Sequence, residues 1–99
     1  MPRIRTHPGE ILVEEYLTPL GLSARQAAAE IGVPPNRLSE IARARRGITA
    51  DTAIRLGVRF GTSPEFWLNL QNAHDLSKAR ATVDYAMVRP REAEPRKTP

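Results

Sequence analysis

Apolar residues recur along this chain at the three- and four-residue spacing of amphipathic helices, in five successive stretches. A proline, a glycine or a potential capping residue bounds each stretch. The predicted helical stretches cover residues 7–21, 23–32, 34–47, 49–61 and 63–81. A strand would alternate with a period of two, and only residues 81–88 offer a weak candidate for one. The pattern therefore predicts an all-α fold.

The spacing also predicts which side chains face the core. In the first helix the expected inward stripe is Ile11, Leu12, Tyr16 and Leu20. In the second, third and fourth helices the expected inward residues are Ala27, Ala28, Ile31, Leu38, Ile41, Ala42, Ala53, Leu56 and Phe60. The fifth predicted helix carries the apolar residues Phe66, Trp67, Leu70, Ala73 and Leu76. Gly57, inside the fourth helix, costs about 1 kcal/mol relative to alanine unless a neighbour packs closely against it.

Local signals mark several helix ends. Ser23 can cap the second helix, and Gln26, three residues later, completes a capping box. Gly32 can adopt the left-handed conformation that ends this helix. The Ser-Pro-Glu sequence at 63–65 is a strong start for the fifth helix. We therefore expect a helical domain over residues 7–85, between a flexible segment 1–6 and a basic, proline-rich tail 86–99.

Composition excludes several classes of site. The chain has no cysteine, so it forms no disulfide, no thiolate zinc site and no cysteine nucleophile. The longest apolar runs are far shorter than the roughly 20 residues of a membrane-spanning helix. The amino terminus has no apolar signal core. These features predict a soluble, cytoplasmic protein without membrane contact.

Positive charge is concentrated in the middle of the chain. Residues 21–60 hold seven arginines against three acidic residues, and arginine supplies 13 of the 15 cationic side chains. Such a concentration is typical of proteins that bind a polyanion. A solvated, arginine-rich surface would show the same excess, so charge alone leaves both interpretations open.

Residues 23–46 have the spacing of a helix-turn-helix. The small residues Ala27 and Ala28 allow a second helix to cross closely, and Gly32 permits a tight turn. Burial of Leu38 and Ile41 would then direct the opposite side of the third helix to solvent. That outward side carries Asn36, Arg37, Ser39, Glu40 and Arg43.

The outward side chains match the chemistry of base edges. Residues at the amino-terminal end of such a helix reach bases when the helix enters a major groove. Asn36 can pair with adenine, Arg37 with guanine, and Glu40 can accept from cytosine. Ser23, Arg25 and Gln26 at the start of the second helix, with Arg43, Arg45 and Arg46 beyond the third, are candidate phosphate contacts. The sequence therefore predicts a DNA-binding surface on which the helix-turn-helix reads the bases.

Four blocks of the sequence resemble HigA-type antitoxins, a branch of the Xre/Cro-like helix-turn-helix proteins. The blocks are HPGEIL at 7–12, GVPPNRLSEI at 32–41, RGITADTA at 46–53 and GTSPEFWLNLQNAHDL at 61–76. The resemblance implies a compact, lambda-repressor-like five-helix domain that dimerises and binds a palindromic operator, repressing its own operon on the nucleoid. It also implies a partner, a RelE/HigB-like toxin that cleaves mRNA at the ribosome.

The resemblance carries over to named positions. It implies base reading by Asn36, Arg37 and Glu40, and phosphate contact by Arg25 and Gln26. For the dimer interface it implies Phe66, Trp67, Leu70 and, at a position where relatives often have an aromatic residue, His74. The chain departs from the pattern at Arg43-Ala44, where relatives usually have Asn-Gly. Because alanine disfavours a left-handed cap, we expect the third helix to continue toward Gly47.

Other functions are less consistent with these residues. His7 and His74 are the only histidines, and no catalytic motif or metal-ligand spacing surrounds them. We therefore expect that the protein is not an enzyme and that it binds no cofactor, metal or small-molecule substrate. Two alternatives remain: a protein-interaction module with the helix-turn-helix as scaffold, and a solitary phage-type repressor without a toxin. A short, basic toxin-like reading frame immediately upstream would favour the antitoxin over the solitary regulator.

Overall fold

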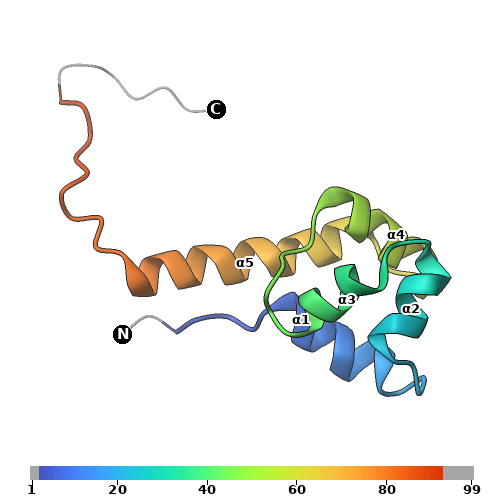
Figure 1. The fold of residues 1–99 in the computed structure, drawn as a ribbon. Coiled ribbons are helices and arrows are strands. Elements are labelled where there is room, and N and C mark those ends of the chain that lie inside the picture. Colours follow the sequence, from blue (N-terminus) through green and yellow to red (C-terminus); the bar gives the residue numbers. More distant parts are fainter. Residues whose placement is uncertain (1–2, 93–99) are drawn as a thin grey trace.

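The computed structural model describes residues 3–92 and arranges them as five helices followed by an extended segment (Figure 1). The helices are α1 (Pro8–Ile11) with its π-helical continuation η1 (Leu12–Leu17), α2 (Ala24–Ile31), α3 (Pro35–Ala42), α4 (Ala50–Phe60) and α5 (Pro64–Thr82). The all-α prediction is confirmed. The weak strand candidate at 81–88 is wrong, because α5 runs to Thr82 and residues 83–92 pair with no strand in the described part of the chain.

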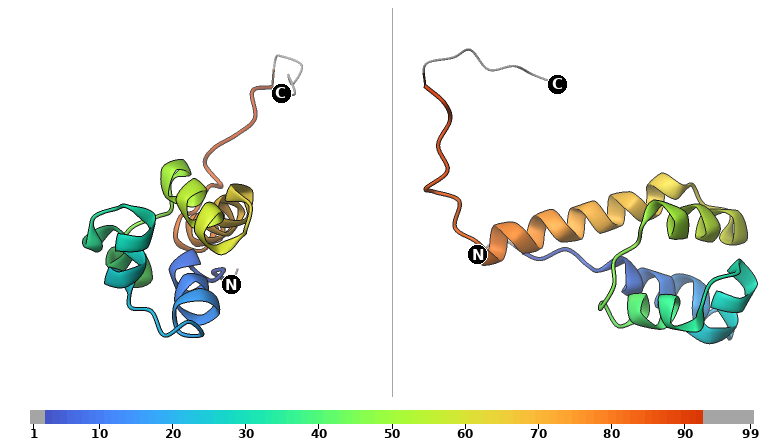
Figure 2. Two further views of the ribbon diagram at one scale, coloured as in Figure 1. Left: turned by 90° about the vertical axis from the view of Figure 1, so that its right-hand side faces the viewer. Right: turned by 45° about the horizontal axis from the view of Figure 1, so that its top comes forward.

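The helices enclose one core. Figure 2 places α4 and the first half of α5 on one side of it, with α1, α2 and α3 on the other. The largest apolar side chains that are fully buried are Trp67, Leu12, Leu38, Ile41 and Leu56. The second half of α5 extends beyond this body (Figure 1). Within residues 3–92, none of the helices is long and apolar enough to cross a bilayer.

The first helix widens into a π turn, which changes its buried side. The Thr18 N–H donates to the Val13 carbonyl at 2.9 Å, a bond that spans five residues. The buried leucines, Leu12 and Leu17, are accordingly five apart. The predicted stripe is therefore wrong at Leu20, which lies in the turn after the helix and is 61% exposed.

Two glycines sit where backbones approach closely. A Cβ on Gly9 would lie 1.8 Å from the Ile41 carbonyl oxygen, so α1 packs directly against the end of α3. A Cβ on Gly57 would lie 2.6 Å from the Thr62 carbonyl oxygen. The close neighbour that would justify a glycine inside α4 is therefore present.

Helix α5 is only partly covered. Its start is as predicted: Ser63 is the N-cap, and its hydroxyl accepts the Phe66 N–H at 3.1 Å. Trp67 is buried, whereas Phe66 and Leu76 are exposed.

The amino-terminal segment is tied to α5. The Arg5 N–H donates to Ser77 Oγ at 2.7 Å, and the Arg5 carbonyl oxygen lies 2.8 Å from His74 Nδ1. His7 packs its ring edge-to-face with that of His74. The expected flexibility of residues 1–6 stays a prediction. Residues 1–2, and 93–99 of the expected tail, lie outside the described part of the chain.

Candidate nucleic-acid interface

Helices α2 and α3 form the expected helix-turn-helix. Ala27 and Ala28 are fully buried, and Leu38 and Ile41 anchor the inner side of α3. Gly32 caps α2 in the left-handed conformation, with φ of 74°. The inward side of α3 is therefore fixed by packing, and this determines which of its side chains face outward.

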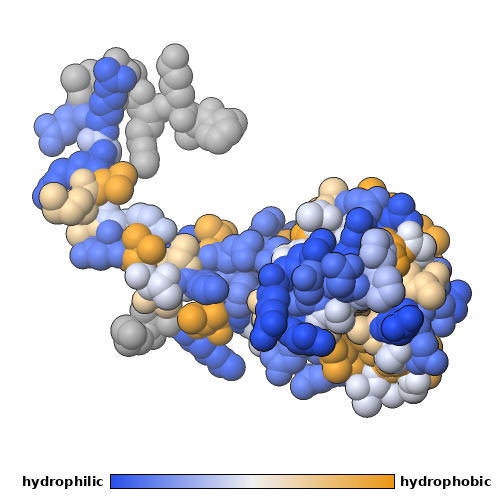
Figure 3. All heavy atoms as spheres, viewed as in Figure 1, coloured by the Kyte–Doolittle hydropathy of each residue, from blue (hydrophilic) through white to orange (hydrophobic). Residues whose placement is uncertain are grey.

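The predicted reading residues share that outward side. Asn36 is exposed, whereas Arg37, Ser39 and Glu40 are half-buried. The Ser39 hydroxyl donates to the Asn36 carbonyl oxygen at 3.3 Å. Figure 3 shows strongly hydrophilic residues gathered over α3 and the loop that follows it. These residues are placed together as the sequence predicted, and their contact with bases stays a prediction.

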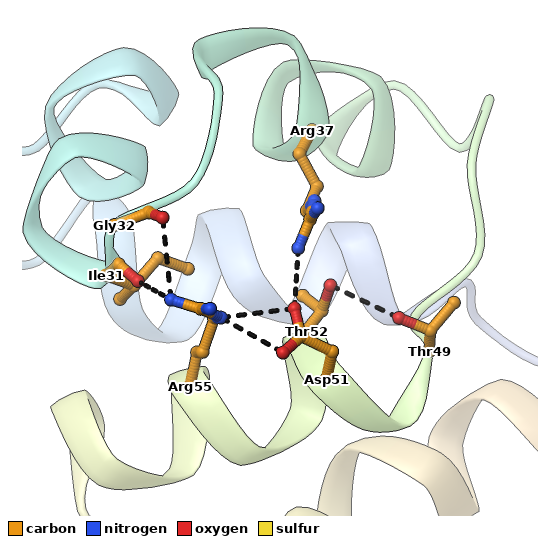
Figure 4. A network of polar contacts seen from close by, with 7 residues as sticks. All are labelled: Ile31, Gly32, Arg37, Thr49, Asp51, Thr52 and Arg55. Carbon is orange, nitrogen blue, oxygen red and sulfur yellow. Dashed lines mark hydrogen bonds and ion pairs between the residues drawn. The ribbon is translucent and has the colours of Figure 1, made fainter.

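Arg37 is held by an acidic residue of α4. Its Nη1 donates to Asp51 Oδ2 at 2.7 Å, and Arg55 Nε donates to the two Asp51 oxygens at 3.2 and 3.1 Å (Figure 4). The hydrogen bonds from Arg55 and Arg37 hold the pKa of Asp51 below its usual value. Sequence spacing did not identify Asp51, since it pairs with a residue 14 positions away on another helix.

Glu40 and Arg46 are paired with each other. Arg46 Nε and Nη2 both donate to Glu40 Oε1, at 3.0 and 2.5 Å. The pair joins the outward side of α3 to the loop before α4. In the free protein, therefore, the candidate cytosine acceptor and the candidate phosphate contact are engaged with each other.

Helix α3 ends earlier than predicted. It stops at Ala42, and Ala44 adopts a left-handed conformation with φ of 59°. The Ala44 N–H donates to the Ile41 carbonyl at 3.0 Å, and the Arg45 N–H to the Glu40 carbonyl at 2.8 Å. These two bonds satisfy carbonyls at the helix end in the manner of a Schellman turn. The expectation that α3 continues toward Gly47 is thus wrong.

The early end of α3 follows from its surroundings. Gly9 of α1 lies directly against the Ile41 carbonyl, so the turn is placed by tertiary packing. Arg43 and Arg45 both remain exposed beyond the helix end.

Contacts with α5 fix the loop between α3 and α4. Gln71 Oε1 accepts the Ile48 N–H at 2.7 Å, and Gln71 Nε2 donates to Asp75 Oδ1 at 2.9 Å. A Cβ on Gly47 would lie 3.2 Å from the Gln71 carboxamide. Gln71 was not singled out in the sequence, because a glutamine on a helix gives no local sign of a loop 23 residues away.

The start of α2 carries the capping box that the sequence predicted. Ser23 Oγ accepts the Gln26 N–H at 3.0 Å, and Gln26 Oε1 accepts the Ser23 N–H at 2.8 Å. Arg25 lies exposed beside them. Both side-chain oxygens are thus engaged in capping, and Arg25 supplies the charge at this end of the surface.

The four α5 residues predicted at a dimer interface differ in accessibility. Trp67 is 0% exposed, and its indole N–H donates to Thr62 Oγ1 at 2.7 Å, so it cannot contact a second protomer directly. Leu70 and His74 are half-buried, and His74 is engaged with Arg5. Phe66 is 36% exposed and is the residue of this set that offers the most apolar surface.

Residues 3–92 contain no group of three or more histidine or acidic side chains arranged to hold a metal ion.

Comparison with known proteins relates this fold to a family. A helix-turn-helix family model matches residues 13–67, more than half of the chain. Virulence-associated protein I of Dichelobacter nodosus is 57% identical over 79 residues, which are 80% of this chain and 71% of that protein.

Two solved structures are similar as well. An addiction module antidote protein of the HigA family from Coxiella burnetii has a TM-score of 0.76 and 49% identity, over 80% of this chain and 86% of that one. The Pseudomonas aeruginosa antitoxin HigA, solved with the higBA promoter, has a TM-score of 0.77 and 44% identity, over 80% and 85%.

Proposed function

Because this chain belongs to the HigA branch of the helix-turn-helix family, we propose that it is the DNA-binding antitoxin of a type II toxin–antitoxin pair. It binds a palindromic operator as a two-fold dimer, represses its own operon and neutralises a toxin. The family is one of regulators and antitoxins, and not of enzymes. Its place of action is the nucleoid, in the cytoplasm.

The observation that carries the DNA-binding proposal is the outward side of α3. Leu38 and Ile41 bury the opposite side, so the polar side chains project away from the body at the amino-terminal half of the helix. This is the half that meets base edges when a helix-turn-helix docks in the major groove. The relative from Pseudomonas aeruginosa was solved with a promoter, which supports the same role here.

Arginines surround that side and would supply the affinity that does not depend on sequence. Arg25 lies at the start of α2, and Arg43 and Arg45 lie beyond the end of α3. Cationic side chains at such positions neutralise phosphates and release counterions, which makes binding weaken as salt increases.

The proposal of a toxin partner is based on membership of the family. The relative from Coxiella burnetii is described as an antidote protein, and the resemblance at residues 61–76 implies a RelE/HigB-like endonuclease as the target. The first helix offers a surface of suitable charge for a basic toxin, since Glu10, Glu14 and Glu15 are all exposed.

The DNA-binding proposal is tested by substituting two arginines of the surface. Arg37→Ala should relax preference at one operator base pair and weaken operator binding about 5- to 150-fold, the effect of losing a bidentate contact worth 1–3 kcal/mol. Arg46→Ala should weaken binding to all duplexes alike and lower the salt slope by about one. A gel-shift salt series with the DNA upstream of the gene measures both effects.

A matched control is Arg59→Ala. Arg59 also forms an ion pair, with Glu30 at 2.8 Å, but it lies near the end of α4. It should bind DNA as the unsubstituted protein does. If Arg37→Ala and Arg46→Ala also bind unchanged, the DNA-binding surface is misplaced.

The dimer is tested by light scattering at micromolar concentration, with and without DNA. We expect a dimer, because short half-sites require two readers about one helical turn of DNA apart. Phe66→Asp should yield a folded monomer, since Phe66 is partly exposed. A dimer that persists in Phe66→Asp would move the interface elsewhere, and a monomeric unsubstituted protein would refute dimerisation.

The antitoxin role is tested by co-expression with the neighbouring toxin-like reading frame. Rescue of growth by this chain supports the proposal. Absence of such a frame, together with intact operator binding, would leave a solitary repressor as the function.

A further inference from the structure

The side chain of Arg37 is restrained by an ion pair with Asp51 of α4. Its Nη1 lies 2.7 Å from Asp51 Oδ2, and the arginine side chain is 29% exposed against 57% for the aspartate. Arginine has five N–H donors, of which Asp51 engages one. The guanidinium group therefore enters any complex partly oriented, with most of its donors still available.

Asp51 is itself fixed by Arg55 of the same helix. Arg55 Nε contacts both carboxylate oxygens of Asp51. Its Nη1 donates to the Ile31 and Gly32 carbonyls at the end of α2, at 2.8 and 3.4 Å. Figure 4 shows the resulting chain of contacts from the turn of the helix-turn-helix, through Arg55 and Asp51, to Arg37.

We propose that Asp51 determines the sequence specificity of DNA binding, acting through Arg37 as a positioning residue. This inference rests on the proposed function, since it assumes that α3 reads an operator. Asp51 orients the guanidinium so that its remaining donors meet a base edge, and it limits the reach of Arg37 toward the phosphate backbone.

Two physical effects support this role. An unrestrained arginine loses rotamer freedom when it contacts DNA, at a cost of about 0.5–1.5 kcal/mol. The contact with Asp51 already orders Arg37 in the free protein, so this cost is smaller on binding. The carboxylate also repels phosphate, which disfavours the backbone contacts that dominate non-specific binding. The hydrogen bonds from Arg55 and Arg37 lower the pKa of Asp51, which favours the charged carboxylate further. Both effects raise the ratio of specific to non-specific affinity.

The experiment uses the full chain and a library of randomised DNA duplexes. Selection with the unsubstituted protein identifies the preferred duplex, and dissociation constants are then measured for it and for single-base variants. Asp51→Asn should lower discrimination at one base pair about 2- to 12-fold, the range that corresponds to the ordering cost of one arginine. Binding to a scrambled duplex should become tighter and its salt dependence steeper.

A double-substitution cycle shows whether the effect passes through Arg37. In the Arg37→Ala background, Asp51→Asn should cause no further loss of discrimination. Asp51→Glu keeps the charge but moves the carboxylate. It should therefore reduce base preference while non-specific binding stays as in the unsubstituted protein.

Glu30→Gln is the matched control. It also removes one negative charge and one surface ion pair, but that pair joins Glu30 of α2 to Arg59 and does not involve Arg37. Thermal melting of every variant separates effects on folding from effects on specificity.

The outcomes are distinguishable. Unchanged discrimination in Asp51→Asn, or an equal loss with and without Arg37, would overturn the role of Asp51 while leaving operator binding intact. An unsubstituted protein that selects no sequence from the library would instead refute the proposed function.

Discussion

Replacing Ala44 by glycine should stabilise the protein. Ala44 has φ of 59° in the turn that ends α3, a conformation that the alanine Cβ disfavours by roughly 1–2 kcal/mol. Glycine loses more conformational freedom on folding, which offsets about 0.5–1 kcal/mol of that gain. The expected net increase in the free energy of unfolding is about 0.5–1 kcal/mol. For a domain of this size it raises the melting temperature by about 2–8 °C.

Thermal melting followed by circular dichroism measures this shift, with Ala29→Gly as the matched control. Ala29 is an exposed residue inside α2, where the same chemical change should cost about 1 kcal/mol. The two substitutions should therefore move the melting temperature in opposite directions. A melting temperature of Ala44→Gly at or below that of the unsubstituted protein would refute the left-handed turn at the end of α3.

Three further substitutions test the packing and the titration described above. Gly9→Ala should destabilise by about 3 kcal/mol or more in urea unfolding, because its Cβ would overlap the Ile41 carbonyl; an unaffected midpoint would contradict the close approach of α1 and α3. Gln71→Leu leaves the buried Ile48 N–H without its acceptor and should cost about 1–3 kcal/mol in the same assay; an unchanged midpoint would contradict this hydrogen bond. Burial lowers the pKa of His7 below 6.5, so its stabilising contribution is complete above pH 6.5 and is lost as the pH falls through the folded-state pKa. The melting temperature should therefore fall more steeply below pH 6.5 than in His7→Asn, which can still cap α1, and parallel curves would exclude this titration.

Features that depend on neighbouring residues could be predicted from the sequence. The caps at Ser23 and Ser63 and the stop at Gly32 involve hydrogen bonds within a few positions. The inner side of α3 followed from the spacing of Leu38 and Ile41. Because these anchors determine the orientation of α3, the outward group of polar side chains could be predicted as well.

Features set by tertiary packing could not be predicted in this way. Propensity alone argued against a left-handed Ala44, but the approach of α1 to the end of α3 decides where that helix stops. Likewise, nothing in the local sequence indicates that Asp51 meets Arg37, since α3 and α4 are brought together by their shared core. The α3 surface was predictable as a group of residues, and its ion pairs were not.

The π turn at Leu12–Leu17 has a consequence for chain length. A π turn holds about one residue more than an α-helical turn, because each of its hydrogen bonds spans five residues and not four. Removing one of the exposed glutamates, Glu14 or Glu15, would leave Leu12 and Leu17 four positions apart, a spacing that also lies on one side of an ordinary α-helix. The first helix can thus absorb a one-residue deletion within itself, leaving the register of α2 and α3 unchanged. Aligned sequences that differ by a single residue in this segment are therefore compatible with the same DNA-reading surface.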